Sequence, residues 1–173
     1  MIEIHSCMNC PLWRTRRNQV VGRGSVPAEI LLIGEAPGKS EDIMGVPFYG
    51  RSGVLLNRGL QEVEKRLSTR NITMPTYYIT NLIECIPYSF TGVLKSIREP
   101  SQMEIERCER NLNVIIRRIM PVRIVTIGAL AKKYMSIRST HSVVHPSFVL
   151  RQGGSSSPVY LTFLQQLEDA FSL

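Results

Sequence analysis

The feature that most constrains the fold of this chain is the alternation of short apolar segments with helical patterns. Four segments rich in aliphatic and β-branched residues are each followed by a small or polar residue: residues 29–33, 77–80, 122–127 and 142–144. Apolar residues at helical spacing fill the intervals between them. This alternation predicts an α/β fold, in which a central, mostly parallel four-stranded sheet carries helices on both faces.

Three helices are expected from their apolar periodicity and their end signals. The first covers residues 52–67, and the second starts near Gln102, because Ser101 and Glu104 have the spacing of a capping box. Ser157 before Pro158 predicts the start of the third. The expected apolar faces are Leu56, Leu60, Val63 and Leu67 in the first helix, Ile105, Leu112, Ile116 and Ile119 in the second, and Leu161, Leu164 and Leu167 in the third.

Length and composition indicate one globular domain, residues 1–173. The chain is 43% hydrophobic and 20% charged, and no apolar run approaches the roughly eighteen residues of a membrane span, so no membrane association is expected. The N-terminus MIEIHSCMNC lacks the basic start and apolar stretch of a signal peptide. We therefore expect a cytoplasmic protein, whose cysteines stay reduced.

The charge balance favours an anionic partner. Lys and Arg number 21 against 14 Asp and Glu, which gives a net charge of +7. An excess of this size is compatible with nucleic acid, although solvated surface charge is the alternative explanation.

The predicted strands end in residues that suit a binding site. The loops that leave the four strands begin with Gly34, Asn81, Gly128 and His145. Ligands of open parallel sheets bind beyond the carboxyl ends of the strands, so we expect these loops to converge on one site. Residues 151–158, RQGGSSSP, are expected to form a surface loop.

The stretch GEAPGKSED, residues 34–42, raises the question of a phosphate-binding loop. A Walker motif requires a glycine five residues before Gly38, where this chain has Ile33. Pro37 removes one backbone N–H from the expected cradle, and Glu35 and Glu41 add negative charge where a phosphate would lie. The sequence therefore disfavours a nucleotide hydrolase.

The four cysteines leave several kinds of site open. Cys7 and Cys10 form a Cys-x-x-Cys pair, whereas Cys85 and Cys108 stand alone. A zinc ribbon usually has two close pairs, an iron–sulfur cluster accepts widely separated thiolates, and buried structural thiols need no metal. Spacing alone does not decide between them.

Five longer motifs resemble one known family, the iron–sulfur uracil-DNA glycosylases often called family 4. They are CMNCPLWRTRRNQVVGRGS, ILLIGEAPGKSEDIMGVPFYGRSGVLLN, YYITNLIECIP, IVTIGALAKKYM and HPSFVLR, and together they extend over most of the chain. The resemblance implies a glycosylase-like domain that flips uracil out of DNA and cleaves its N-glycosidic bond, leaving an abasic site. Uracil-containing DNA is the expected partner, a monomer is expected, and repair or replication partners are not identified.

The resemblance assigns roles to the reacting and base-binding residues. Glu35, with Ala36, Pro37 and Gly38, would lie beside the sugar and position water, and Glu41 would close the base pocket. His145 would donate to the uracil oxygen that gains charge. The base itself would stack on Phe48 and hydrogen-bond to Asn81.

The remaining implied roles concern DNA and the cofactor. Ser147 and Arg151, in the HPSFVLR loop, would contact DNA. Cys7, Cys10, Cys85 and Cys108 would hold a structural [4Fe–4S] cluster. A diverged relative that acts on another modified base, or that binds nucleic acid or a partner without catalysis, is the alternative.

Two segments differ from the family pattern. YSFTGVLKSIREP, between Cys85 and Cys108, is longer than the usual connection. Only nine residues separate Met135 from His145, so the fold is expected to be trimmed before the HPSFVLR loop.

Overall fold

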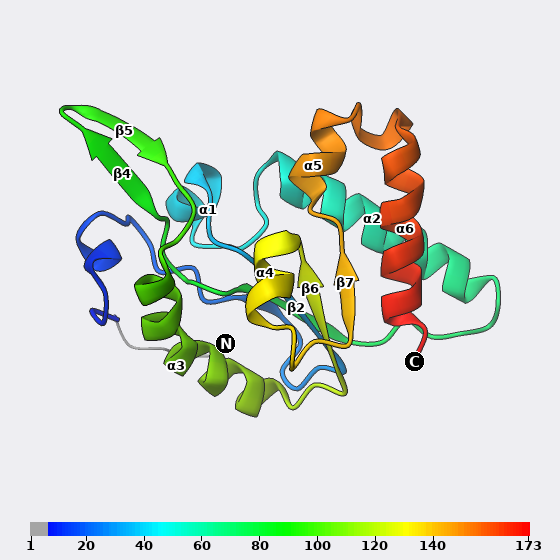
Figure 1. Cartoon of the computed structure of the whole chain (residues 1–173). Coiled ribbons are helices and arrows are strands. Elements are labelled where there is room, and N and C mark those ends of the chain that lie inside the picture. The colour runs from blue at the N-terminus through cyan, green and yellow to red at the C-terminus, as the bar shows by residue number, and fades with distance from the viewer. Residues whose placement is uncertain (1–6) are drawn as a thin grey trace.

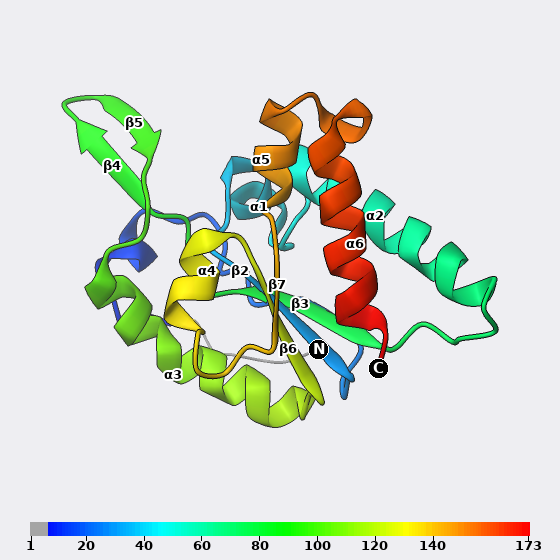
Figure 2. The ribbon, with the colours of Figure 1, turned by 45° about the vertical axis from the view of Figure 1, so that its right-hand side comes forward.

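A computed structural model describes residues 7–173, and residues 1–6, which carry part of the N-terminal pattern discussed above, lie outside it. The central sheet has the strand order β1-β3-β2-β6-β7 (Figures 1 and 2). Four strands run parallel, as predicted: β2 (Ile30–Gly34), β3 (Tyr77–Asn81), β6 (Arg123–Ile127) and β7 (His141–Val143). The short β1 (Arg23–Gly24) adds an antiparallel edge strand beside β3. Its two residues show no apolar alternation, so the sequence did not predict it.

Helices cover both faces of the sheet, which confirms the predicted layers (Figures 1 and 2). α2 (Arg51–Ser68) and α6 (Pro158–Phe171) pack on one face against Ile30 and Leu32 of β2. α3 (Gln102–Ile119) and α4 (Ala129–Tyr134) pack on the other against Leu31 and Ile33. Because alternate residues of a strand point to opposite faces, the unbroken apolar run of β2 supplies both cores.

The predicted helix faces are confirmed in α2 and wrong at one position in α6. Leu161 is 65% exposed, whereas Leu164 and Leu167 are buried. The buried residues of α6 follow the spacing i, i+3, i+4, i+7 from Tyr160, and Leu161 lies outside that stripe. The buried face consists of Tyr160, Phe163, Leu164, Leu167, Ala170 and Phe171.

The capping box at the start of α3 is confirmed. The Glu104 backbone N–H donates to the Ser101 hydroxyl over 3.3 Å, and the Ser101 N–H donates to the Glu104 carboxylate over 2.8 Å. Arg98 also pairs with Glu104, 2.6 Å away. The start of α3 is therefore tied to the segment that precedes it.

Several short elements lie at the carboxyl edge of the sheet or beyond it. α1 (Lys39–Met44) follows β2, and η1 (Pro11–Arg14) lies in the N-terminal segment. The HPSFVLR segment, expected as a loop, forms the helix α5 (Pro146–Arg151), because Pro146 fixes a helical φ and His145 caps the first turn. Residues 151–158, also expected as a loop, contain the 3-10 helix η2 (Gly154–Ser156).

An additional hairpin occupies the long segment between Cys85 and Cys108. β4 (Tyr88–Thr91) and β5 (Leu94–Ile97) pair antiparallel as a separate two-stranded sheet that projects from the body (Figure 1). In the part of the chain that the structure describes, no helix has the length and apolar character needed to cross a bilayer.

Candidate functional site

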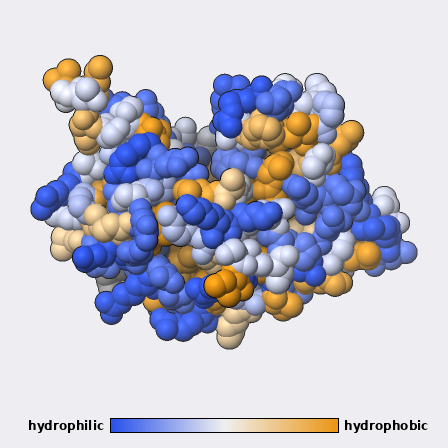
Figure 3. Space-filling model, in the orientation of Figure 1, coloured by the Kyte–Doolittle hydropathy of each residue, from blue (hydrophilic) through white to orange (hydrophobic). Residues whose placement is uncertain are grey.

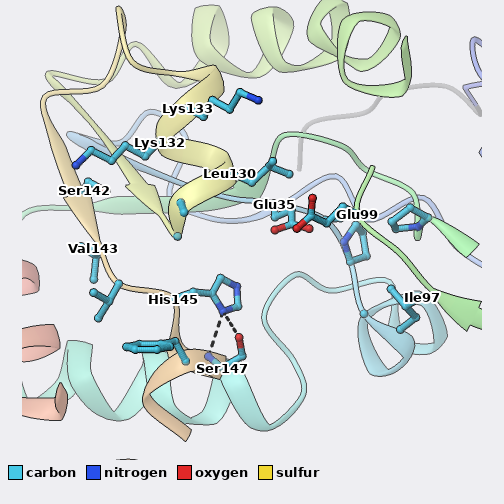
Figure 4. A pocket seen from close by; sticks show the side chains of 18 of the residues that line it. Glu35, Ile97, Glu99, Leu130, Lys132, Lys133, Ser142, Val143, His145 and Ser147 are labelled. Atoms are coloured by element: carbon cyan, nitrogen blue, oxygen red, sulfur yellow. Dashed lines mark hydrogen bonds between the residues drawn. The ribbon is translucent and has the colours of Figure 1, made fainter. Parts of the chain in front are cut away.

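A pocket of about 800 Å³ lies at the carboxyl ends of the parallel strands. Its walls come from the loop after β2, the start of α4, the end of β7, α5 and the outgoing end of the hairpin (Figure 4). Of the expected site residues, Glu35, Ala36, Pro37, Gly38, His145, Ser147 and Arg151 line it. The prediction that the strand-end loops converge is therefore confirmed for β2, β6 and β7.

Glu41 joins two loops beside the pocket. One of its carboxylate oxygens accepts from the Gly38 N–H at 3.1 Å, and the other accepts from the N–H groups of Tyr49 and Gly50 at 3.0 and 2.9 Å. A carboxylate that accepts three backbone N–H groups is held in one place. The geometry thus gives Glu41 a positioning role, in which it ties the loop after β2 to the turn that carries Phe48.

Asn81 and Phe48 do not line the large pocket but meet beside it, over the last residue of β2. A Cβ atom added to Gly34 would lie 2.5 Å from Asn81 Oδ1 and 2.6 Å from Phe48 Cζ. Only glycine at this position lets both side chains reach the strand end. The Asn81 side chain is 3% exposed, and no hydrogen bond within residues 7–173 engages its amide.

Phe48 has an unusual backbone conformation and lies close to His145. Its φ is 52°, in the left-handed region that costs a non-glycine residue about 1–3 kcal/mol. The centroids of the Phe48 and His145 rings are 6.1 Å apart. The structure therefore brings together Phe48, Asn81 and His145, which come from three distant parts of the sequence.

The hydrogen bonds of His145 determine which ring nitrogen carries its proton. His145 caps α5, and the Ser147 backbone N–H donates to Nδ1 over 3.1 Å. A nitrogen that accepts this bond carries no proton, so the neutral ring holds its proton on Nε2. Figure 4 shows the imidazole directed into the pocket and its two bonds to Ser147. The pocket thus receives an N–H donor.

Burial keeps His145 in this neutral form. Desolvation lowers the pKa of His145 below its ordinary value of 6.5, and the positive charge of Arg151 lowers it further, while Glu41 acts in the opposite sense. Gly128 permits the close packing, since a Cβ there would lie 3.2 Å from two His145 atoms and its φ is 96°. His145 is therefore a neutral donor at physiological pH.

Glu35 is the carboxyl group on the opposite wall. Burial raises the pKa of Glu35 above its ordinary value, and the negative charge of Glu99 raises it further. Figure 4 shows the two carboxyl groups side by side. Glu99 was not predicted as a site residue, because its approach depends on where the hairpin returns to the body.

All four cysteines line one narrow cavity between the N-terminal segment, the loop after β3 and α3. Cys85 and Cys108 are buried, and Cys7 and Cys10 are half-buried. Burial raises the pKa of Cys85 to about 11 and also raises those of Cys10 and Cys108. Within residues 7–173, no set of three or more His, Cys, Asp or Glu side chains is arranged to hold a single metal ion.

A polar network surrounds the cysteine cavity. Arg16 donates to Cys85 Sγ over 3.0 Å. Glu84 is 2% exposed, and one of its carboxylate oxygens accepts from Gln19 and Asn111, at 2.6 and 2.8 Å. The other oxygen, Oε1, is buried without a hydrogen-bond partner among residues 7–173. Sequence reasoning missed these residues because their partners are distant along the chain.

Similarity to a known protein family identifies the family of this chain. The model of the Uracil DNA glycosylase superfamily matches residues 21–168, which include β2, β3, β6, β7 and the pocket they build. The chain belongs to this superfamily. Both the family expected from the motifs and its mostly parallel α/β fold are confirmed.

Several curated relatives are similar in sequence to this superfamily member. A type-4 uracil-DNA glycosylase of Saccharolobus solfataricus is 38% identical over 133 residues, which are 77% of this chain and 56% of that protein. Another from Archaeoglobus fulgidus is 36% identical over 133 residues and 60% of its length. A third, from Thermotoga maritima, is 35% identical over 132 residues and 62% of its length. The chain thus spans less than two thirds of these relatives.

Within this superfamily fold, the pocket also holds groups that the sequence did not suggest. Lys132 and Lys133 of α4 line it, as does Phe148 of α5. The sequence does show that the two lysines follow Gly128 closely and that Phe148 follows His145. An exposed basic pair or a lone aromatic residue is, however, too common to indicate a site. They give the mouth of the pocket a basic and partly apolar rim.

Proposed function

We propose that this protein removes uracil from DNA by cleaving the bond between the base and its deoxyribose, leaving an abasic site. Membership of the superfamily and similarity to proteins named type-4 uracil-DNA glycosylases support this assignment. The observation that carries it is the neutral His145, whose Nε2–H faces the pocket because Ser147 occupies Nδ1.

The geometry suits the charge that develops in this reaction. As the glycosidic bond breaks, the base departs as an anion and the sugar becomes electron-poor. A preorganised donor aimed at the base oxygen stabilises the transition state, and one such donor is worth roughly 3 kcal/mol. A neutral imidazole provides that donor without giving its proton away in the ground state. His145 therefore serves as an electrostatic catalyst.

Base recognition would fall to Asn81 and Phe48. The Asn81 amide offers one donor and one acceptor, which match the adjacent acceptor and donor on the edge of uracil. The Phe48 ring would stack on the base and offset part of the cost of flipping it out of the helix. The loop that Glu41 holds at Gly38 would exclude the methyl group of thymine.

Glu35, Ala36, Pro37 and Gly38 would surround the sugar on the other side of the base. Glu35 lines the pocket and has a raised pKa, which suits a carboxyl group that holds a water molecule near the electron-poor sugar carbon. Gly38 leaves space for the backbone to approach the deoxyribose.

DNA would lie across the pocket mouth. Ser147 and Arg151 belong to α5, beside His145, and Arg151 Nη1 lies 3.4 Å from the Ser147 hydroxyl. Lys132 and Lys133 add positive charge next to them. Such groups bind phosphates and hold the target strand without reading its sequence.

Cys7, Cys10, Cys85 and Cys108 would hold a [4Fe–4S] cluster. The chemistry of the donor set fits, because four sulfur atoms line a single cavity. Each thiolate of such a cluster binds a different iron, so its ligands stand further apart than those of one ion. The cluster would supply structure, since its ligands join the N-terminal segment to α3 and to the loop after β3. We further propose that residues 1–173 act as one cytoplasmic, monomeric domain.

A cleavage assay tests this function. The protein is incubated with oligonucleotides that carry uracil or thymine at one position, and alkali-labile sites are counted. Cleavage confined to uracil is expected. Binding to DNA without cleavage would instead assign the chain to a non-catalytic or differently specific branch of the superfamily.

A further inference from the structure

We propose that the β4–β5 hairpin is a second DNA-binding surface, which stacks against unpaired bases of the strand that flanks the target nucleotide. This inference rests on the proposed function, since it takes DNA as the ligand. It concerns a different surface, however, and it implies that the protein engages single-stranded DNA more tightly than duplex DNA.

One face of the hairpin continues the wall of the pocket. Tyr88 pairs with Ile97 across the two strands, and Phe90 pairs with Lys95. Residues that pair directly across an antiparallel ladder share a face, so these four side chains lie on the same side. Ile97 lines the pocket. The face therefore leads outward from the pocket toward the tip of the hairpin.

The hairpin stands clear of the body, on the side of the pocket opposite α5. Figures 1 and 2 both show it projecting beyond the sheet, and Figure 3 shows apolar atoms at its tip, across a hollow from the opposite rim. Phe90 is 54% exposed and Val93, in the turn, is 99% exposed. Such apolar exposure on a projecting element indicates a contact surface.

The chemistry of this face suits a nucleic-acid strand. The rings of Tyr88 and Phe90 have centroids 6.4 Å apart. Lys95 Nζ lies 3.4 Å from the centroid of the Tyr88 ring and 5.8 Å from that of Phe90. Aromatic rings interleaved with a cation form the surface on which proteins stack successive bases while they neutralise phosphates.

The charge around the hairpin fits the same ligand. Residues 88–97 contain Lys95 and no Asp or Glu. The pocket lining beside the hairpin includes the basic Lys132, Lys133 and Arg151, together with the carboxyl groups of Glu35 and Glu99. A strand whose target base enters the pocket would thus meet Lys95 on the hairpin and three basic side chains of the pocket lining. An aromatic ring can stack only on a base whose face is exposed. Unpaired nucleotides expose the faces of their bases, and paired ones do not.

The test uses Phe90→Ala and Lys95→Ala, with two matched controls. Ile137→Ala removes an apolar side chain that is 98% exposed, in the connection before β7, and Lys65→Ala removes an exposed lysine from α2. The probe is a fluorescent oligothymidylate, used alone and annealed to its complement, and binding is followed by anisotropy over a range of salt concentrations. Melting temperatures verify that each variant is folded.

We expect Phe90→Ala to weaken binding of the single strand about tenfold while duplex binding changes by less than about twofold. Lys95→Ala should lower the slope of log affinity against log salt by about one. Both controls should match the unaltered protein. An unchanged affinity for the single strand, or an equal loss on both probes, would overturn the proposal and leave the hairpin as a surface for another macromolecule.

Because oligothymidylate contains no uracil, this measurement is independent of cleavage. If the protein fails to cleave uracil but Phe90→Ala still weakens single-strand binding, the hairpin proposal holds and the glycosylase proposal fails. If uracil is cleaved and the hairpin variants bind normally, the reverse is true.

Discussion

At the scale of single residues, the site depends on one histidine whose proton position is fixed by its neighbour. The Ser147 N–H bonds to Nδ1 of His145, and burial keeps the ring neutral. Phe48 and Asn81 approach the same strand end only because Gly34 has no side chain. The His145 ring, the Phe48 ring and the Asn81 amide are thus placed by backbone features.

Replacing His145 with alanine should lower the single-turnover rate of uracil cleavage by roughly 100-fold, because the lost donor acts mainly in the transition state. DNA affinity should change by only a few-fold. His141→Ala is the matched control, since His141 begins β7, the strand that leads to His145, and does not line the pocket. A well-folded His145→Ala variant with an unchanged rate would remove His145 from the mechanism.

The lowered pKa of His145 gives the reaction a definite pH dependence. Above about 6.5 the ring is neutral in both the folded and unfolded states, so stability does not depend on it. As pH falls below that value, the unfolded state binds the proton first, and the free energy of unfolding declines until the folded pKa is reached. The cleavage rate should likewise stay level through pH 6.5 and fall at lower pH.

This dependence is measurable in two ways. Denaturant unfolding across this pH range should show the decline in the unaltered protein and a smaller one in His145→Ala. Nitrogen-15 NMR of the imidazole at neutral pH should show the proton on Nε2. A proton on Nδ1 would contradict the hydrogen bond from Ser147.

At the scale of secondary-structure elements, the pocket is held by connections between loops. Glu41 of α1 accepts from backbone N–H groups on two separate turns. Asp42, its neighbour, accepts from the N–H groups of Arg17 and Asn18, at 2.8 and 3.2 Å. Two adjacent carboxylates of one short helix therefore fasten the loop after β2, the turn that carries Phe48 and the N-terminal segment to each other.

Glu41→Gln should therefore destabilise the protein by about 1–3 kcal/mol. The amide replaces one carboxylate oxygen with an NH₂ group, so the backbone N–H groups that donated to that oxygen lose their acceptor and face another donor. Discrimination between uracil and thymine should weaken as the loop at Gly38 loosens. Glu64→Gln, on the exposed side of α2, is the matched control. Equal unfolding midpoints for the two variants would show that Glu41 does not brace the loops.

The sequence predicted the elements that bury their own apolar pattern and missed those that depend on distant contacts. The four parallel strands and the three long helices were visible because periodicity alone marks them. β1 has only two residues, and the β4–β5 hairpin exposes most of its side chains, so neither shows a buried pattern. In the site, the strand-end glycines and His145 were predictable, whereas the bracing by Glu41 and the approach of Glu99 arise only in the folded chain.

At the scale of the whole molecule, the cysteine cavity joins the N-terminal segment to the body. Leu12 of that segment packs with Ile83, Cys85, Ile105 and Cys108 in a third core cluster. Beyond this small core, the segment is attached mainly by polar contacts, including the one between Arg16 and Cys85. A cluster bound at the four cysteines would add the strongest connection between the segment and α3.

Protein purified without oxygen should therefore be brown and contain about four irons per chain. Cys108→Ala should lose both the colour and the iron. Its melting temperature should fall to that of the unaltered protein stripped of iron by a chelator, because the binding energy of the metal contributes to folding. Iron analysis and thermal unfolding test this. A colourless protein with one zinc per chain would exclude the cluster.

The positions of the cysteines along the chain have a consequence for biosynthesis. All four lie within the first 108 residues, and α3, which carries the last of them, ends at Ile119. His145 and α5 follow later, after β7, which is the last strand of the sheet in chain order. During synthesis the four cysteines and α3 thus leave the ribosome before His145, so the residues that line the cysteine cavity are available before the pocket is complete.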